Sequence, residues 1–260
     1  KPITQTGPYN PNATEPYNRL QSVVLSLSKG PIAFSDQIGY TDRDLLMSCC
    51  NDDGLILTPD ESATMIDSYF YQYSGLKING NIPGPNGEVS ATFVNIGQNQ
   101  IFRYLYVLSV NLITDYVLTR DDLDYYIKDN DDTLAWLAYE ANATTTYYEF
   151  NSNNAVNLSK SDKYSFEYYT FIPINPDNMD GWYLQGELSK WITVSKQRFI
   201  DVNVVDNTGS IKVLIKGAQN EKVNVAFVQP STGKQQIISC VIDGTLQAVI
   251  RMPAGTCQPY

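Results

Sequence analysis

"FIDVNVVDNTGSIKVLIKGAQNEKVNVAFV", residues 199–228, is the stretch that most directly decides the fold of this chain. Apolar and polar residues alternate along it with a period of two, and the polar clusters DNTG and GAQNE divide it into three runs. Such alternation is typical of strands that bury one face. Together with the β-rich runs that follow it, the stretch predicts a small antiparallel β-sandwich over residues 199–260. The expected inward positions are Val202, Val204, Ile211, Val213, Ile215, Val223, Val225 and Phe227.

The middle of the chain, residues 59–198, also has the composition of strands. Runs such as IFRYLYVLSVNLI (101–113) and KYSFEYYTFIPI (163–174) are rich in aromatic and β-branched residues, and clusters of Gly, Asn, Asp and Pro separate them. These residue types favour strands over helical bundles. We therefore expect one antiparallel β domain here and a chain that is mainly β.

The N-terminal part, residues 1–58, has a different character. Residues 1–14 carry three prolines and no periodicity, which predicts a linker arm. A helix is expected from a cap at Thr14 to a stop at Gly30, because apolar residues recur there at helical spacing. Its expected inner face is Leu20, Val23, Val24 and Leu27.

A short buried strand should follow that helix and end at Asp36, the place where α/β proteins put site residues. A second short helix is expected from a cap at Thr41 or Asp42 to Gly54. Its predicted inner face is Leu45, Leu46, Cys49 and Cys50. This α/β segment is too small to fold alone.

Charge excludes several classes of function. The chain of 260 residues has a formal net charge of −10 and no histidine. Such acidity argues against nucleic acid and anionic membranes as partners, and no apolar run is long enough to span a bilayer. The absence of histidine excludes histidine-based triads and most zinc sites. We expect no cofactor and no metal.

Cysteines and acceptor sequons indicate a secreted, extracellular protein. Cys240 and Cys257 flank a terminal strand pair, so a disulfide closing a loop of roughly 17 residues is expected between them. Of the adjacent pair Cys49 and Cys50, we expect one buried thiol and one with an outside partner. Glycosylation is predicted at the sequons that begin at Asn12, Asn142 and Asn157.

"EPYNRLQSVVLSLSKGPIAFSDQIGYTDRDLLMSCCNDDGLILTPDESAT", residues 15–64, resembles the end of the barrel in the α-galactosidase and raffinose-synthase superfamily of glycoside hydrolases. A second similarity lies in residues 168–199, which resemble the β domain that follows such barrels. The matching positions of the first stretch are Gly30, Pro31, Ser35, Asp36, Ile38, Gly39, Asp53, Gly54, Leu57 and Pro59.

The resemblance implies that residues 15–58 are the last strand–helix units of a (β/α)₈ barrel. In such enzymes the two catalytic carboxylates come from earlier strands, so no catalytic residue is assigned in this chain. Asp36 is then either a substrate-binding residue at the barrel mouth or a carboxylate that caps the next turn. An N-terminal companion segment, from the same precursor or a separate chain, is expected to complete the barrel.

Three further features each have two interpretations. The acidic run 121–132 is either a calcium site or a solvated turn, and it lacks the spacing of a known calcium loop. Glu187 is either catalytic or paired with a neighbour such as Lys190. Three tryptophans are either sugar-stacking residues or core residues, namely Trp136, Trp182 and Trp191.

Three functions remain open. The first is the C-terminal portion of a secreted glycoside-hydrolase-like protein, which completes the barrel, covers it with β domains and acts with its companion on carbohydrate. The second is a noncatalytic structural or adhesive extracellular protein. The third is a carbohydrate-binding module.

Overall fold

Antiparallel strands make up most of the chain in a computed structural model, which describes residues 15–33, 36, 39–74, 84–97, 102–127, 135–205 and 209–260. Within these ranges strands account for 41% and helices for 15% of the residues. Every strand pair is antiparallel. The prediction of a mainly β, antiparallel fold is therefore confirmed.

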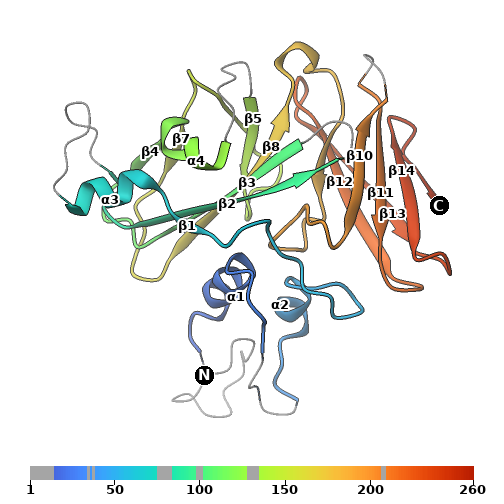
Figure 1. Ribbon diagram of the computed structural model, residues 1–260, viewed down its shortest axis with the longest axis horizontal. Helices are drawn as coiled ribbons and strands as arrows, with labels where there is room; N and C mark the ends of the chain where they lie inside the picture. The colour runs from blue at the N-terminus through green and yellow to red at the C-terminus, as the bar shows by residue number, and fades with distance from the viewer. Residues whose placement is uncertain are drawn as a thin grey trace.

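Two helices of the N-terminal part lie against the large sheet (Figure 1), α1 (Asn18–Leu27) and α2 (Arg43–Met47). The predicted cap Asp42 is confirmed, because its carboxylate accepts a hydrogen bond of 3.0 Å from the backbone N–H of Leu45. The buried residues of α1 are Ser22, Val23, Ser26 and Leu27, so the prediction that Val24 lies on the inner face is wrong: Val24 is 45% exposed, because the buried face is turned toward Ser22 and Ser26.

Two further expectations for this segment differ from the structure. α2 ends at Met47 and not near Gly54, because the backbone turns back so that the N–H of Leu57 donates to the carbonyl of Cys49. The expected strand between the helices is not seen among residues 31–33 and 36, and no described strand lies beside them to pair with it. Thr14 and the linker arm lie outside the described residues.

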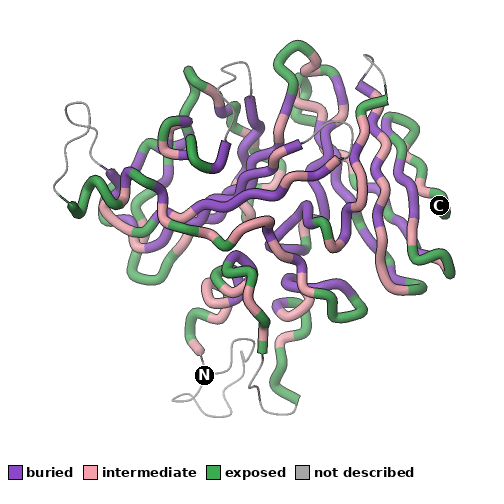
Figure 2. The backbone as a smooth tube through the Cα atoms, viewed as in Figure 1, coloured by how far each residue is buried: buried purple, intermediate pink, exposed green. Residues whose placement is uncertain are grey.

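The largest sheet has six strands in the spatial order β1-β2-β3-β8-β5-β6. Its long central strands are buried on both faces (Figure 2), which explains why their sequences are nearly continuous apolar runs and not alternating ones. The bounds are β1 Thr64–Met65, β2 Glu88–Ile96, β3 Phe102–Val110, β8 Phe166–Ile174, β5 Ala135–Glu140 and β6 Tyr148–Phe150.

Each face of this sheet has its own apolar cluster. Tyr104 and Tyr106 of β3 point to the face that carries α1 and α2, and Leu105 and Val107 point to the opposite face. Smaller elements cover that opposite face, and these are α3 (Asp67–Ser74), β4 (Tyr116–Leu118), η1 (Asp121–Leu123), α4 (Asp124–Ile127) and β7 (Val156–Leu158).

The C-terminal strands form two further sheets, with the orders β10-β11-β14-β15 and β13-β12-β9. After η2 (Pro176–Asn178), their bounds are β9 Tyr183–Gly186, β10 Phe199–Val204, β11 Ile211–Lys216, β12 Lys222–Gln229, β13 Lys234–Val241, β14 Gln247–Met252 and β15 Thr256–Pro259. The chain thus changes sheet between β11 and β12.

The inward positions predicted for residues 199–228 are buried in one apolar cluster, with one exception. Val204 is 37% exposed because β10 ends there, beyond the part of the sheet that is covered. β9 precedes residue 199 and pairs with β12, so hydrogen bonds cross the predicted domain boundary. The division into domains 1–58, 59–198 and 199–260 stays a prediction.

Candidate functional site

A cavity of about 530 Å³ lies where α1 and α2 meet the large sheet, and we call it the helix–sheet cavity. Its volume falls within the roughly 300–1,000 Å³ typical of small-molecule sites. Residues of five segments line it, namely Asn18, Arg19, Asp42, Asp44, Leu45, Ser48, Tyr139, Ala141, Asn142, Thr144, Tyr168, Thr170, Leu188, Ser189, Lys190, Trp191 and Thr193.

The floor and the rim of the cavity differ in composition. Buried residues of β5, β8 and the loop after β9 form the floor, among them Tyr139, Thr170 and Thr193. Exposed charged and amide side chains form the rim, among them Arg19 and Asp44. A ligand that entered would pass polar groups before reaching hydroxyls and aromatic rings.

Trp191 is part of this cavity, but most of its ring is covered. Its indole N–H donates to the hydroxyl of Ser22 at 2.8 Å, and the guanidinium of Arg19 lies 5.2 Å from the ring centre. Tyr168 packs edge-on against it and donates its hydroxyl proton to the Trp191 carbonyl at 2.7 Å. These contacts hold the indole in one orientation.

The other two tryptophans lie elsewhere. Trp136 is a core residue, because its ring is buried against Phe150 on the opposite face of the sheet. Trp182 is half-buried and lies beneath the ammonium of Lys234, 5.9 Å from the ring centre. Sugar stacking by Trp182 or Trp191 stays a prediction.

The hydroxyl of Tyr139, on the floor of the cavity, has no partner in normal hydrogen-bond geometry among the described residues. Burial raises the pKa of Tyr139 to about 12, and the nearby hydroxyls of Thr193 and Thr170 oppose this rise. A buried hydroxyl without a good partner costs about 1–3 kcal/mol. A small polar ligand that reached this hydroxyl would remove that cost.

Replacing Tyr139 by phenylalanine is therefore expected to leave the free energy of unfolding unchanged or to raise it by about 1 kcal/mol. Tyr104→Phe is the matched control, because the equally buried Tyr104 hydroxyl donates to the carbonyl of Leu184 at 2.9 Å. That variant should lose about 1 kcal/mol. Urea unfolding of both variants checks the pair, and an equal loss in both would contradict the assignment of an unpaired hydroxyl.

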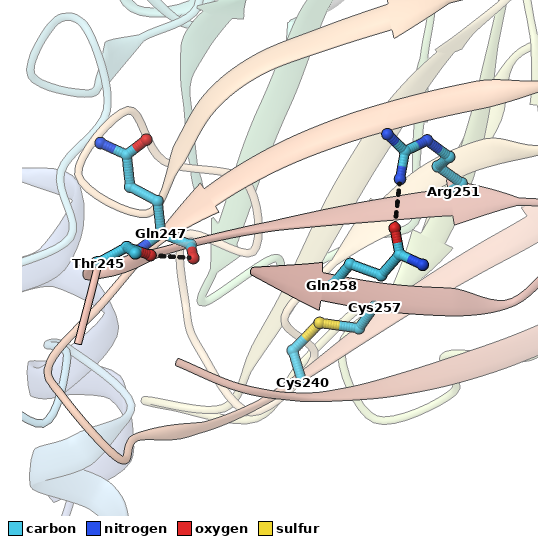
Figure 3. Close-up of a disulfide and its surroundings, with 6 residues drawn as sticks. All are labelled: Cys240, Thr245, Gln247, Arg251, Cys257 and Gln258. Atoms are coloured by element: carbon cyan, nitrogen blue, oxygen red, sulfur yellow. Dashed lines mark hydrogen bonds between the residues drawn. A yellow bond between two sulfur atoms is a disulfide. The ribbon is translucent and has the colours of Figure 1, made fainter. Parts of the chain in front are cut away.

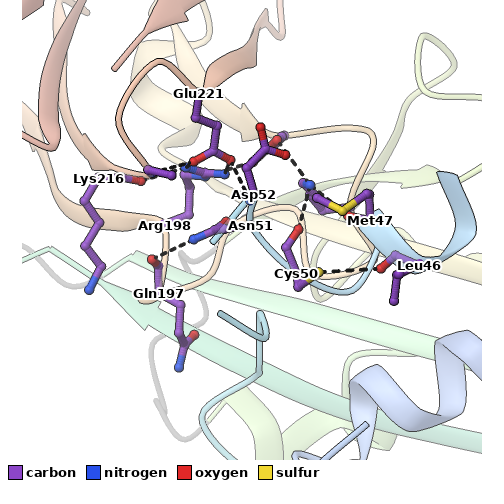
Figure 4. A network of polar contacts seen from close by, with 12 residues as sticks. Leu46, Met47, Cys50, Asn51, Asp52, Gln197, Arg198, Lys216 and Glu221 are labelled. Atoms are coloured by element: carbon purple, nitrogen blue, oxygen red, sulfur yellow. Dashed lines mark hydrogen bonds and ion pairs between the residues drawn. The ribbon is translucent and has the colours of Figure 1, made fainter. Parts of the chain in front are cut away.

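A buried network of charges lies behind the cavity, centred on Arg198 (Figure 4). The Arg198 side chain is completely buried and donates to both carboxylate oxygens of Glu221, to Glu187 at 3.0 Å and to the carbonyl of Lys216 at 2.8 Å. A Cβ at Gly217 would lie 2.4 Å from the guanidinium and from Glu221, so a larger residue there would displace this pair. We call this set the Arg198 network.

The network fastens the N-terminal segment to the sheets. The ammonium of Lys190 donates to the carbonyls of Met47 and Cys50 at 2.7 and 2.8 Å and lies 3.7 Å from Glu187. The backbone N–H of Asp52 donates to Glu221. The predicted pairing of Glu187 with Lys190 is therefore confirmed.

The two carboxylates of the network titrate differently. Burial raises the pKa of Glu187 above its ordinary range, and the charges of Arg198 and Lys190 offset only part of this. Burial also acts to raise the pKa of Glu221, but the hydrogen bonds and charge of Arg198 outweigh it, so its pKa lies below the ordinary range. Both side chains are buried and form ion pairs with Arg198, in agreement with the interpretation of Glu187 as a paired carboxylate.

The predicted disulfide between Cys240 and Cys257 is confirmed (Figure 3). It joins β13 of the three-stranded sheet to β15 of the four-stranded sheet. Cys49 and Cys50 are both free and buried, so neither offers a surface thiol for the outside partner we expected. The thiol of Cys49 lies between the hydroxyls of Ser22 and Ser26.

The structure describes Asp36 but tests no role for it. Both carboxylate oxygens are screened from solvent and have no hydrogen-bond partner among the described residues. Residues 34, 35, 37 and 38 lie outside those residues. Substrate binding by Asp36 stays a prediction, and so does the capping alternative.

The sequons lie in different surroundings. Asn12 falls outside the described residues. Asn142 is exposed at the rim of the cavity, where its amide donates to Glu140 at 2.8 Å and its carbonyl accepts from Arg19 at 3.3 Å. Asn157 is exposed on β7. Glycosylation at all three positions stays a prediction.

Metal sites and membrane-spanning helices can be assessed only within the described residues. Within them, no three acidic or cysteine side chains gather as a metal site requires. Residues 128–134 fall outside, so the calcium interpretation of the acidic run stays a prediction. None of the described helices has the length and hydropathy needed to cross a bilayer.

Comparison with known proteins assigns no family: no protein-family model matches the chain, and no curated protein matches it.

The sequence did not predict two features, the helix–sheet cavity and the Arg198 network. Their residues are scattered over more than 100 positions of the chain, from Arg19 to Thr193 and from Met47 to Glu221. The only local signal was the charged residues within the apolar stretch around Glu187, where an unpaired buried charge would be costly.

Proposed function

We propose that this chain is the noncatalytic C-terminal portion of a secreted glycoside-hydrolase-like protein, which completes the barrel of a companion segment and covers it with β-sheets. In this proposal residues 15–58 are the last strand–helix units of the barrel. The two C-terminal sheets form a small sandwich behind it. The catalytic carboxylates belong to the companion, and the whole acts on carbohydrate.

The observation that carries the proposal is the uncovered outer side of the N-terminal segment. Val24 of α1 is 45% exposed, and the apolar residues Tyr17, Tyr40 and Leu55 of the same segment are also exposed. The helices stand on one side of the sheets and nothing described covers their other side (Figure 1). A companion that covered this side of the segment would bury these exposed apolar side chains.

The Arg198 network supports the same proposal. It ties Met47, Cys50 and Asp52 to the sheets through buried hydrogen bonds, so this part of the N-terminal segment keeps a fixed position. A fixed segment suits the completion of a barrel, because the partner strands would meet preformed helices. It also leaves Glu187 and Glu221 in structural roles, which is why the chain is proposed to be noncatalytic.

Native mass spectrometry of the protein from its natural source tests the proposal, with a denaturing measurement beside it. We expect a stoichiometric second chain or a longer precursor that ends in this sequence. A folded monomer of 260 residues with no companion would overturn the proposal and favour a structural or adhesive protein.

A pair of valine variants makes the test specific to the proposed surface. Val24→Asp on α1 should weaken companion binding at least tenfold without unfolding the chain, because the side chain is exposed. Val117→Asp is the matched control, since Val117 is 56% exposed on β4, on the other side of the large sheet. Retention of the companion by both variants would show that α1 is not the interface.

A further inference from the structure

We infer that the helix–sheet cavity is a binding site for a single pyranose ring, separate from any site at the mouth of a barrel. The inference deepens the proposed function, on which it rests for the kind of ligand such a protein meets. The cavity itself belongs to this chain alone.

The charges around the cavity select a neutral ligand. Asp42 and Asp44 at the rim would repel an anion. Lys190 does not compensate for them, because its ammonium is already engaged by two backbone carbonyls and by Glu187. Arg19 at the same rim opposes a cation, and its guanidinium is already held over Trp191 and against Asn142.

The hydrogen-bonding groups match a ligand with many hydroxyls. The hydroxyls of Tyr139, Thr170 and Thr193 both donate and accept, while the carboxylate of Asp44 only accepts. Tyr139 is 1% exposed and lacks a partner in normal geometry among the described residues. The hydroxyl is screened from the cavity as the side chains now lie, and a small shift of the floor would let a sugar hydroxyl supply that partner.

The shape and the apolar lining of the cavity favour a ligand that contains a ring. Leu188 and the uncovered edges of Tyr168 and Trp191 give the cavity an apolar side next to its hydroxyl groups. A pyranose has the same division, with C–H groups on its ring face and hydroxyls around its edge. The volume of about 530 Å³ fits a small ligand and not an extended chain.

Two sources supply such a ring. One is a free or terminal sugar from outside the molecule. The other is the first sugar of a glycan on Asn142, because this sequon lies at the rim of the cavity. The chemistry is shared, and host cells with and without N-glycosylation separate the two sources.

The experiment is saturation-transfer NMR on the full chain, made without N-glycosylation, with the methyl glycosides of galactose, glucose, mannose and N-acetylglucosamine as probes. We expect at least one probe to bind. Thr170→Val should weaken the affinity for that probe at least tenfold, and Thr92→Val should leave the affinity unchanged. Thr92 is a matched control because it is buried in the same sheet but outside the cavity.

Asp44→Asn is the second test, because Asp44 is exposed and its replacement does not disturb the core. It should also weaken the affinity for the probe at least threefold. Equal effects of Thr170→Val and Thr92→Val, with no effect of Asp44→Asn, would overturn the inference. The absence of binding by every probe would also overturn it, if an endoglycosidase removes the glycan of the glycosylated chain completely. Complete removal would show that the cavity does not shelter a sugar of that glycan either.

The same measurement on glycosylated protein identifies the source. Probe binding that is lost on glycosylation and restored by Asn142→Gln assigns the cavity to the chain's own glycan. Probe binding that glycosylation leaves unchanged assigns it to an external sugar. Failure of the companion experiment with successful probe binding would disprove barrel completion and keep the cavity as a sugar site.

Discussion

Arg198→Met is expected to lower the free energy of unfolding by about 3–5 kcal/mol, because it leaves buried carboxylates without their counter-charge. Glu221 would lose both guanidinium hydrogen bonds at once, one of which is also its ion pair with Arg198. Glu187 would keep only Lys190 at 3.7 Å. Removing one partner of a buried pair costs far more than the pair itself contributes.

Urea unfolding followed by circular dichroism measures this effect. Lys196→Met is the matched control, since Lys196 forms an ion pair of 2.7 Å with Asp60 but its side chain is 51% exposed. An exposed pair contributes about 0–1 kcal/mol. Similar losses in both variants would contradict the assignment of a buried network.

Arg198→Lys is a second variant, which keeps the prediction testable if Arg198→Met does not fold. It keeps the charge but not the planar fork that engages both oxygens of Glu221. We expect a loss between those of the other two variants.

The double variant Cys240→Ser, Cys257→Ser is expected to lose about 3 kcal/mol of stability, as the chain-entropy model gives for a loop of this length. The bridge closes a loop of 17 residues and joins strands of two different sheets. β15 is an edge strand of four residues at the end of the chain, so few other contacts hold it in place.

Wild-type protein with reductant is the companion measurement and should unfold at the same urea concentration as the double variant. Cys50→Ser is the control, because Cys50 is a free thiol and forms no bridge. Unchanged stability of the double variant would mean that the reduced strands remain paired without the bridge.

The predictability of this fold from sequence depended on how local each signal was. The alternation around Val213 and Val225 is a property of neighbouring residues, so it located the C-terminal strands correctly. The spacing between Cys240 and Cys257 likewise predicted their bond. Even so, the alternation did not reveal that β12 leaves the sheet of β11, because pairing partners are chosen in three dimensions.

Local signals failed where tertiary contacts decide. The length of α2 was overestimated because nothing in its sequence shows the turn that returns Leu57 to Cys49. Val204 fits the alternation and is exposed nonetheless, because burial depends on what lies opposite a residue and not on its periodicity.

The sequence by itself determined the mainly β, antiparallel class, the inward faces of the last strands and one disulfide. The tertiary structure alone decided which strands share a sheet, that Arg198 lies buried between Glu187 and Glu221, and that Arg19, Tyr139 and Trp191 line one cavity. The physical reason is how far apart along the chain the interacting residues lie. Strand periodicity arises within a few residues, whereas ion pairs and cavities form between segments that only the completed fold brings together.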